Sequence, residues 1–330
     1  MPRAMFSAAL LALVCAGALR CSFSIAAELR ITARSAVDFA SVAQGRAILG
    51  RVDEYVRGMN AFDRKLRLDR EDALGEADYL NFIQSQVTAW PAEEQQHVAA
   101  VVEKLSARLQ GLDLPLPPRV LLIRTTGAGE EGDAYTRANA IVLPARNSGA
   151  VPEKLLDLLA HELFHLMTRR DPAFRERAYA LIGFRLSPQI ALPAALAERR
   201  IGNPDAPGLD TYVELTVNGR PLLAAPVLLA GEDFSLQVGV ELSDYWQLRF
   251  LAVEPDGRGG VQPVVAEGSP VLYALHEVGG FFERVGTNTS YLIHPEEILA
   301  DNFALMVAGG RVNDPQRLEQ LRALFQRAPR

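Results

Sequence analysis

Residues 153–169 constrain the fold of this 330-residue chain more than any other segment. Pro152 suits a first helical position and the pair Asp171-Pro172 is a helix stop, so the sequence predicts one continuous helix between them. Apolar side chains cover nearly the whole circumference of this helix, as is typical of a helix that is buried on all sides. The remaining structure must therefore be built around it.

The same helix carries the sequence His161-Glu162-Leu163-Phe164-His165. Residues four apart share one face of a helix, so the two imidazoles can bind one metal ion, and the glutamate between them can reach a water beside that ion. HExxH on a helix is the pattern of a zinc site with an adjacent general base. The alternative is a core helix whose two histidines each find polar partners in an apolar setting.

A catalytic zinc ion takes three protein ligands and keeps one position open, so a third ligand is needed. Residues 166–203 contain no histidine, and the candidates lie far downstream: His276, His294, Glu296 and Glu297. In a helix that begins at residue 295, Glu297 has Asp301 one turn later on its own face, placed to accept the outer N–H of a metal-binding histidine. Glu296 has only an alanine there, so Glu297 is the predicted ligand. The helix dipole also favours acidic residues in a first turn without any metal.

The residues His161, Glu162, His165, Glu297 and Asp301 resemble the signature of the gluzincin metallopeptidases, the thermolysin-like branch of the zincins, in which HExxH is followed by ExxxD on a second helix. The segment HPEEILADNFA is also similar to that of a group of predicted bacterial zinc proteases. The resemblance implies that His161, His165 and Glu297 bind one Zn²⁺, that Glu162 is the general base and that Asp301 orients a ligand histidine. The long spacing between the two motifs departs from the compact members of the family.

The resemblance also implies that residues 138–143 form the edge strand of the cleft and that a bound peptide lies extended along it. Hydrolysis of an amide needs a donor that stabilises the tetrahedral oxyanion. The sequence offers His276, Tyr291 and several arginines, and Tyr291 is the predicted donor because it lies just upstream of the ligand helix. Asp157, one turn before His161, is a candidate partner for a ligand histidine or an ordinary surface carboxylate.

The patterns along the chain indicate an α+β protein, and the resemblance implies a zincin-like metallopeptidase fold with a helical N-terminal region and a β-rich insertion. Helical spacing is found over residues 35–111, 270–284 and from 295 onward, with a last helix opened by Asp314-Pro315, and β-like runs at 119–125 and 138–143. Further β-like runs lie at 212–217, 227–229, 236–242 and 246–253. The predicted parts are a signal peptide (1–26), a helical N-terminal region (27–111), a catalytic lobe (112–200), a β-rich insertion (201–267) and a second catalytic part (268–330).

The first residues have the pattern of a secretory signal peptide. A positive start at residues 1–3 is followed by an apolar run at 5–19 and a small-x-small cleavage site at 24–26. The run is shorter than a membrane-spanning helix needs, so we expect export to the periplasm or medium and no stable membrane span after cleavage. A retained anchor and lipidation at Cys21 are the alternatives. Both cysteines, Cys15 and Cys21, lie in this segment, so the mature chain would carry no thiol.

These features predict an exported zinc metallopeptidase that acts on a peptide or protein substrate. The net charge of −6 comes without a basic block, which argues against nucleic acid as a partner. One alternative is a zinc amidase acting on cell-wall or other non-protein amides, and another is a non-catalytic periplasmic binding or scaffold protein that keeps the metal for stability. A His, His and carboxylate set can also hold iron. Substrate, latency and oligomeric state are not predicted.

Overall fold

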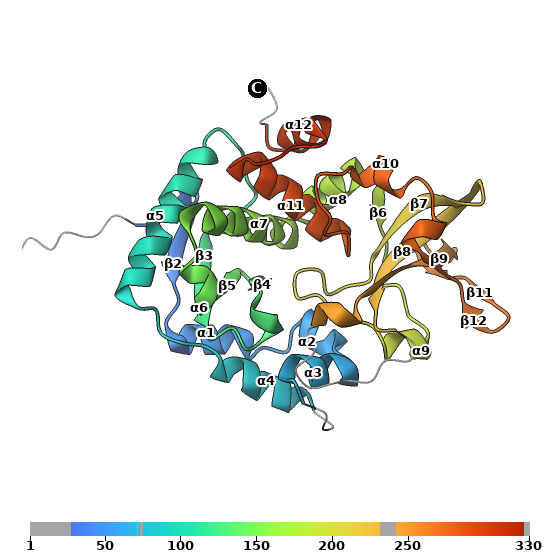
Figure 1. The fold of residues 1–330 in the computed structure, drawn as a ribbon, viewed down its shortest axis with the longest axis horizontal. Helices are drawn as coiled ribbons and strands as arrows, with labels where there is room; N and C mark the ends of the chain where they lie inside the picture. The colour runs from blue at the N-terminus through green and yellow to red at the C-terminus, as the bar shows by residue number, and fades with distance from the viewer. Residues whose placement is uncertain (1–27, 71, 73–74, 232–241, 327–330) are drawn as a thin grey trace, which may run out of the picture.

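The computed structural model describes residues 28–70, 72, 75–231 and 242–326. The predicted signal peptide and most of the β-like run at 236–242 lie outside these residues. The described chain is a mixed α+β protein, as the sequence predicts. Its two main sheets lie at opposite sides of the molecule, with the long helices α7 (Pro152–Arg170) and α11 (Pro295–Ala308) in the region between them (Figure 1).

The first sheet has five strands in the order β1-β2-β3-β5-β4. The middle strands are parallel, and the two outer ones pair antiparallel with their neighbours. The strands are β1 (Arg30–Thr32), β2 (Ser35–Phe39), β3 (Arg119–Thr125), β4 (Tyr135–Arg137) and β5 (Ala140–Pro144). The predicted strand at 119–125 is confirmed with the same bounds.

Two expectations about this sheet are wrong. Residues 35–39 are not helical but form β2. A short apolar run fits both the period of a helix and that of a strand, and here its parallel pairing with β3 decides for the strand. The strand predicted at 138–143 is not the edge of the sheet, because β5 is bonded to β3 on one side and to β4 on the other. The edge on this side of the sheet is β4, which follows the Gly-rich turn and the short 3-10 helix η1 (Glu130–Gly132).

Helices cover both faces of the first sheet. Val120 and Leu122 of β3 face the core that contains α5 and α7, whereas Ile123 belongs to the core on the opposite face, which contains α1, α2 and α4. This alternation follows the two-residue period of a strand. The helices before α7 are α1 (Val42–Leu49), α2 (Glu54–Gly58), α3 (Ala61–Leu68), α4 (Glu76–Ser85), α5 (Ala92–Arg108) and α6 (Ala145–Ser148).

Helix α7 is buried on nearly all sides, as its sequence predicts, and packs against α11. Phe164 of α7 and Phe303 of α11 contribute to this contact, with ring centroids 6.0 Å apart. The helix predicted from residue 295 and the final helix opened by Asp314 are confirmed. Around this pair lie α8 (Pro172–Leu181) and α12 (Pro315–Ala323).

The second sheet is antiparallel and contains the β-like runs predicted at 212–217, 227–229 and 246–253. The Asn218-Gly219 turn joins two of its strands with positive φ at both residues, 50° and 74°. Its strands are β6 (Phe184–Leu186), β7 (Thr211–Val217), β8 (Arg220–Leu229), β9 (Gln247–Pro255), β10 (Val261–Pro263) and β13 (Leu272–Ala274).

The helical expectation for residues 270–284 is wrong for most of that segment. Residues 272–274 form β13, which pairs with β9. The backbone of β9 supplies hydrogen-bond partners to this strand, and a helix at 272–274 would not use them. The short elements nearby are α9 (Ala194–Ala197), η2 (Leu242–Tyr245), β11 (Val265–Ala266), β12 (Ser269–Pro270), η3 (Leu275–Glu277) and α10 (Phe281–Val285).

Candidate metal centre

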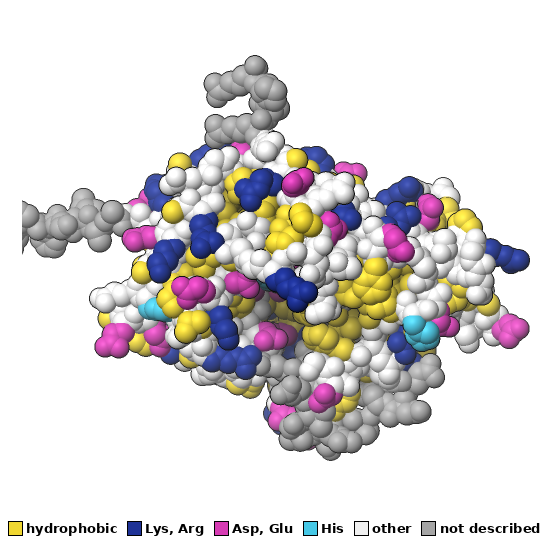
Figure 2. Space-filling model, turned by 45° about the horizontal axis from the view of Figure 1, so that its top comes forward, with side chains coloured by type: hydrophobic (Ala, Val, Ile, Leu, Met, Phe, Trp, Pro, Cys, Tyr) yellow, Lys and Arg dark blue, Asp and Glu magenta, His cyan; other side chains and the backbone are white. Residues whose placement is uncertain are grey.

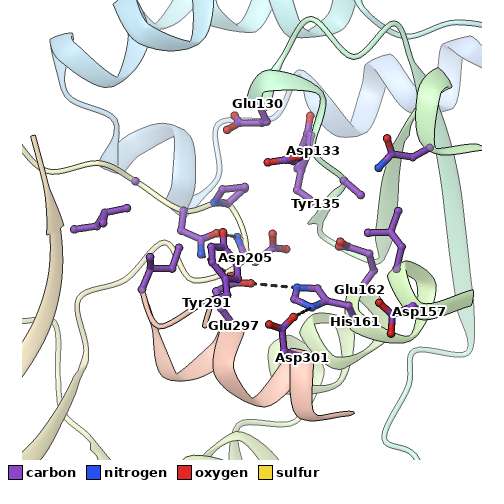
Figure 3. A pocket seen from close by; sticks show the side chains of 18 of the residues that line it. Glu130, Asp133, Tyr135, Asp157, His161, Glu162, Asp205, Tyr291, Glu297 and Asp301 are labelled. Atoms are coloured by element: carbon purple, nitrogen blue, oxygen red, sulfur yellow. Dashed lines mark hydrogen bonds and ion pairs between the residues drawn. The ribbon is translucent and has the colours of Figure 1, made fainter. Parts of the chain in front are cut away.

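Helices α7 and α11 bring His161, His165 and Glu297 to one point. Oε2 of Glu297 lies 3.2 Å from Nε2 of His161 and 3.6 Å from Nε2 of His165. One potential ligand atom from each of the three residues falls within 4.8 Å of the other two. The three residues that the sequence predicts as ligands therefore form one cluster, and the ring of His161 lies between Glu297 and Asp301 (Figure 3).

The outer nitrogen of each histidine is held by a carboxylate. Nδ1 of His161 is 2.9 Å from Oδ1 of Asp301, the contact expected for Asp301. Nδ1 of His165 is 3.0 Å from Oε1 of Glu296. Carboxylates in this position fix the tautomer and orientation of a metal-binding histidine and leave Nε2 free for the metal.

Glu296, a candidate for the third ligand, instead holds a ligand histidine, a role that is not among the sequence predictions. It is fully buried and accepts hydrogen bonds from the hydroxyls of Thr168, at 2.6 Å, and Tyr179, at 2.5 Å, in addition to its contact with His165. A signal for it exists in the sequence. Two ligand histidines need two acceptors for their outer nitrogens, and Asp301 can serve only one of them.

The protonation equilibria show that the cluster favours positive charge. Burial lowers the pKa of His161, but the hydrogen bonds to Asp301 and Glu297 more than offset this, and the pKa ends well above its usual value. Burial also lowers the pKa of His165, yet the charges of Asp205 and Glu297 raise it to about 9. Burial raises the pKa of Glu297, and the two histidines lower it to about 2. The electrostatic field at the meeting point therefore fits a cation.

Glu162 lies beside the cluster with its carboxylate buried. Among the described residues its Oε2 has no hydrogen-bond partner, and neither does Nε2 of His165. Burial, followed by the charge of Asp205, raises the pKa of Glu162 to about 8. Unpartnered buried polar atoms are costly. A metal ion bound by Nε2 and a water next to Glu162 would satisfy both atoms, so the residues present fit a zinc site.

The segment 202–205 completes the surroundings of the cluster. The side-chain amide of Asn203 donates a 2.6 Å hydrogen bond to Oε1 of Glu297. Asp205 accepts a 2.8 Å bond from the backbone N–H of Thr136 on the edge strand β4. Asp205, Glu162 and His165 form a second group, in which one potential ligand atom from each residue lies within 4.8 Å of the other two. Asn203 and Asp205 are not predicted from the sequence, because no spacing rule links this segment to either motif.

Helix α3 anchors this segment from the N-terminal region. Asp63 accepts a 3.1 Å hydrogen bond from the backbone N–H of Gly202, and Arg67 donates a 2.6 Å hydrogen bond to the backbone carbonyl of Gly202. Asp63 and Arg67 form an ion pair of 2.8 Å with side chains only 1% exposed, and Arg67 also pairs with Glu130 at 2.9 Å. The metal cluster is thus connected through Asn203 and its neighbour Gly202 to Arg67 and Asp63 of a buried charge network, which precede Gly202 by 135 and 139 residues.

The remaining candidates lie in different places. Tyr291 lines the cavity in front of the cluster and stacks on Trp246, with ring centroids 5.9 Å apart. Asp157 is exposed but lines the same cavity. His294 caps α11, where its Nδ1 accepts the N–H of Glu296 at 3.1 Å, and burial lowers its pKa to about 4. His276 is exposed in η3 and does not line the cavity.

No protein-family model, no curated protein and no solved structure matches the chain. None of the helices in the described part of the chain is long and apolar enough to cross a membrane. The site is described by its geometry alone: two histidines one helical turn apart, a glutamate from a second helix, and a buried glutamate beside them.

Proposed function

We propose that this chain is an exported zinc metallopeptidase, in which His161, His165 and Glu297 bind one Zn²⁺ and Glu162 is the general base. The observation that carries the proposal is the meeting of these three side chains beside the buried carboxylate of Glu162, whose Oε2 has no hydrogen-bond partner among the described residues. A purely structural histidine pair would not need that carboxylate. A buried carboxylate whose pKa is raised by burial and by a neighbouring carboxylate is more typical of catalytic sites than of cores.

Bound zinc would supply Lewis acidity, which polarises a carbonyl and lowers the pKa of water toward about 7. Glu162 would accept a proton from the attacking water and deliver it to the leaving amine. Asp301 and Glu296 would hold the two imidazoles in their tautomers. Tyr291 is the proposed donor to the oxyanion, because it lines the cavity that contains Glu162 and Glu297.

A zincin-like arrangement of the fold belongs to the same proposal. Its support is the short antiparallel edge strand β4, which lies next to α7 at the cavity. Ala134 and Tyr135 line that cavity, so a peptide lying along the start of the strand would reach the cluster. The cavity has a volume of about 770 Å³, which is large enough for a few amino-acid residues.

The first experiment is elemental analysis of the mature protein, purified without residues 1–26 and dialysed against a mild chelator. The proposal expects about one zinc per chain. The second experiment incubates the zinc-loaded protein with a peptide library and, in parallel, with muropeptides. Cleavage confined to peptides supports a peptidase, and turnover of muropeptides alone would assign the amidase activity instead. A protein that binds no zinc after add-back would end the proposal.

Glu162→Gln separates the base from the metal. This variant keeps the size and shape of the side chain, so zinc content should remain at about one per chain. Hydrolysis should fall by about 10² to 10⁴, which is the usual contribution of a positioned general base. Full activity in this variant would remove Glu162 from its proposed role, and loss of zinc would show that it is needed to build the site.

A further inference from the structure

Two cavities lie along the edge strand β4. The larger one, in front of the metal cluster, is lined by Ala134 and Tyr135 at the start of the strand. The smaller one, of about 260 Å³, is lined by Thr136 and Arg137. Pro204 lines both cavities, so the segment that carries it divides them. A groove that would otherwise follow the whole strand is therefore interrupted at Thr136.

Hydrogen bonds fix this dividing segment to the strand. Oδ1 of Asp205 accepts a 2.8 Å bond from the backbone N–H of Thr136 and a second bond from the hydroxyl of Thr136. Arg169 of α7 donates to the hydroxyl of Thr136 at 2.5 Å and to the backbone carbonyl of Pro204 at 3.3 Å. An added peptide strand needs the backbone groups of the edge that it joins. Because the N–H of Thr136 is already bonded, a peptide at the start of β4 cannot continue past Thr136.

The other end of the large cavity is open. Asp133 and Arg146 line it just outside β4, with side chains 79% and 62% exposed. Figure 2 shows the molecule hollowed near its middle, with acidic and basic side chains along one side of the hollow. A peptide antiparallel to β4 runs in the opposite direction to this strand. Its N-terminus would therefore lie toward the closed end at Thr136, and its later residues toward the open end at Asp133.

The carboxylate of Asp205 lies at the closed end, next to the metal cluster. One potential ligand atom of Asp205 is within 4.8 Å of such atoms of Glu162 and His165. Oδ2 of Asp205 and Oε2 of the buried Glu162 have no hydrogen-bond donor among the described residues. Arg169 is 3.8 Å from Oδ1 of Asp205, and both of its Nη atoms are bonded elsewhere. Two neighbouring carboxylates without donors favour a cationic group that carries N–H bonds.

The spacing suits the free α-amine of a peptide. Within one amino acid the α-nitrogen lies about 2.5 Å from the carbonyl carbon, as the two bond lengths and the angle between them require. A peptide whose first carbonyl lies at the cluster, beside Glu162, therefore places its α-amine within reach of Asp205. The ammonium group supplies both the positive charge and the donors that this end of the cavity lacks. A terminal carboxylate at the same place would be repelled by both acidic side chains.

We infer that Asp205 binds the free α-ammonium group of the substrate, and that the enzyme is an aminopeptidase, which removes residues from the N-terminus of a peptide. The inference rests on the proposed function and adds the substrate class to it. The first peptide bond breaks, the hydroxyl of the attacking water joins its carbonyl carbon, and Glu162 delivers the proton of that water to the leaving nitrogen. Asp205 selects the free amine, and its segment excludes chains that extend past Thr136.

The first test measures binding by titration calorimetry to the zinc-loaded Glu162→Gln protein, in which turnover is suppressed. The probes are two alanine tetrapeptide amides that differ only in whether the N-terminus is free or acetylated. We expect the free amine to lower Kd by about ten-fold or more, because acetylation removes the charge that Asp205 binds. Adding Asp205→Asn should abolish this preference, since asparagine still accepts the N–H of Thr136 but carries no charge.

The matched control is Asp133→Asn, the same change at the open end of the same cavity, which should leave the preference intact. Equal affinity for the two peptides in the Glu162→Gln protein, no binding of either, or a preference that survives Asp205→Asn would overturn the inference. So would loss of the preference in Asp133→Asn, which would place the amine at the opposite end.

The second test needs no variant. Zinc-loaded wild-type protein is incubated with a peptide of six different residues, free or acetylated at its N-terminus, and the products are followed by mass spectrometry. We expect successive loss of single residues from the N-terminus of the free peptide and no cleavage of the acetylated one. Internal cleavage of either peptide would overturn the inference and leave the proposed peptidase function in place. A protein without zinc, detected by elemental analysis before any peptide is added, would instead refute the proposed function.

Discussion

The side-chain amide of Asn203 donates a 2.6 Å hydrogen bond to Oε1 of Glu297, 94 residues later in the chain. This bond occupies one oxygen of the carboxylate and leaves Oε2 between the two Nε2 atoms. Glu297 is thereby held in an orientation in which one oxygen faces both histidines. The segment that supplies Asn203 belongs to neither motif, so the metal cluster depends on a third part of the chain.

Asn203→Ala should weaken zinc binding about 10- to 100-fold, the usual effect of losing a group that orients a ligand. Without the amide donor, Glu297 can rotate and lose its alignment with His161 and His165. Competition with a chromophoric chelator measures the affinity. Asn147→Ala removes an amide from the same cavity, where no contact with Glu297 is found among the described residues, and should bind zinc like the wild-type protein. An unchanged affinity in Asn203→Ala would mean that the hydrogen bond does not contribute to metal binding.

Glu296→Gln should lower both zinc affinity and stability. The charge that favours the N–H of His165 disappears, and one donor among Thr168, Tyr179 and the new amide is left without an acceptor in a fully buried site. We expect a loss of about 1–3 kcal/mol in the free energy of unfolding of the metal-free protein, measured with urea. Glu153→Gln at the exposed start of α7 is the control and should cost less than about 0.5 kcal/mol.

Arg67→Met should destabilise the protein by about 3–5 kcal/mol, because it leaves Asp63 and Glu130 buried without their common cation. It should also release Gly202, whose carbonyl Arg67 holds. Urea unfolding gives the first effect and zinc affinity the second. Arg70→Met breaks the exposed pair with Asp72 and should change stability by no more than about 1 kcal/mol. Similar losses in the two variants would contradict the role given to the buried pair.

Zinc should raise the temperature of unfolding, and a chelator should reverse the change. Binding to the folded state alone stabilises by about 2.7 kcal/mol when free zinc is 100 times Kd. His165→Ala should abolish the response, because it removes a ligand and leaves Glu296 without its histidine. Differential scanning calorimetry with and without zinc measures both. A midpoint that does not move with zinc in the wild-type protein would argue that no metal binds the folded state.

The sequence predicts the two central helices well, because α7 and α11 carry strong start and stop signals and continuous apolar patterns. Helical spacing places His161 and His165 on one face and Asp301 one turn after Glu297, and the family resemblance implies that Glu297 joins the two histidines. Residues 35–39 and 272–274 were misread because pairing with a distant strand, rather than local period, decides the conformation of short apolar runs. Asn203 reaches the site only through tertiary packing, whereas the place of Glu296 follows from the need of a second ligand histidine for an acceptor.

The edge strand β4 is short, and its outward backbone N–H at Thr136 is already bonded to Asp205. Its neighbour Arg137 is 2% exposed and pairs with Asp53 at 2.6 Å. Unpaired edges are where sheets of separate molecules join and aggregate. Because Asp205 occupies this donor, the edge resists open-ended pairing with other copies of the chain, while the stretch before Thr136 remains accessible from the cavity. The same carboxylate that lies near Glu162 therefore also protects the β4 edge of this sheet from pairing with other molecules.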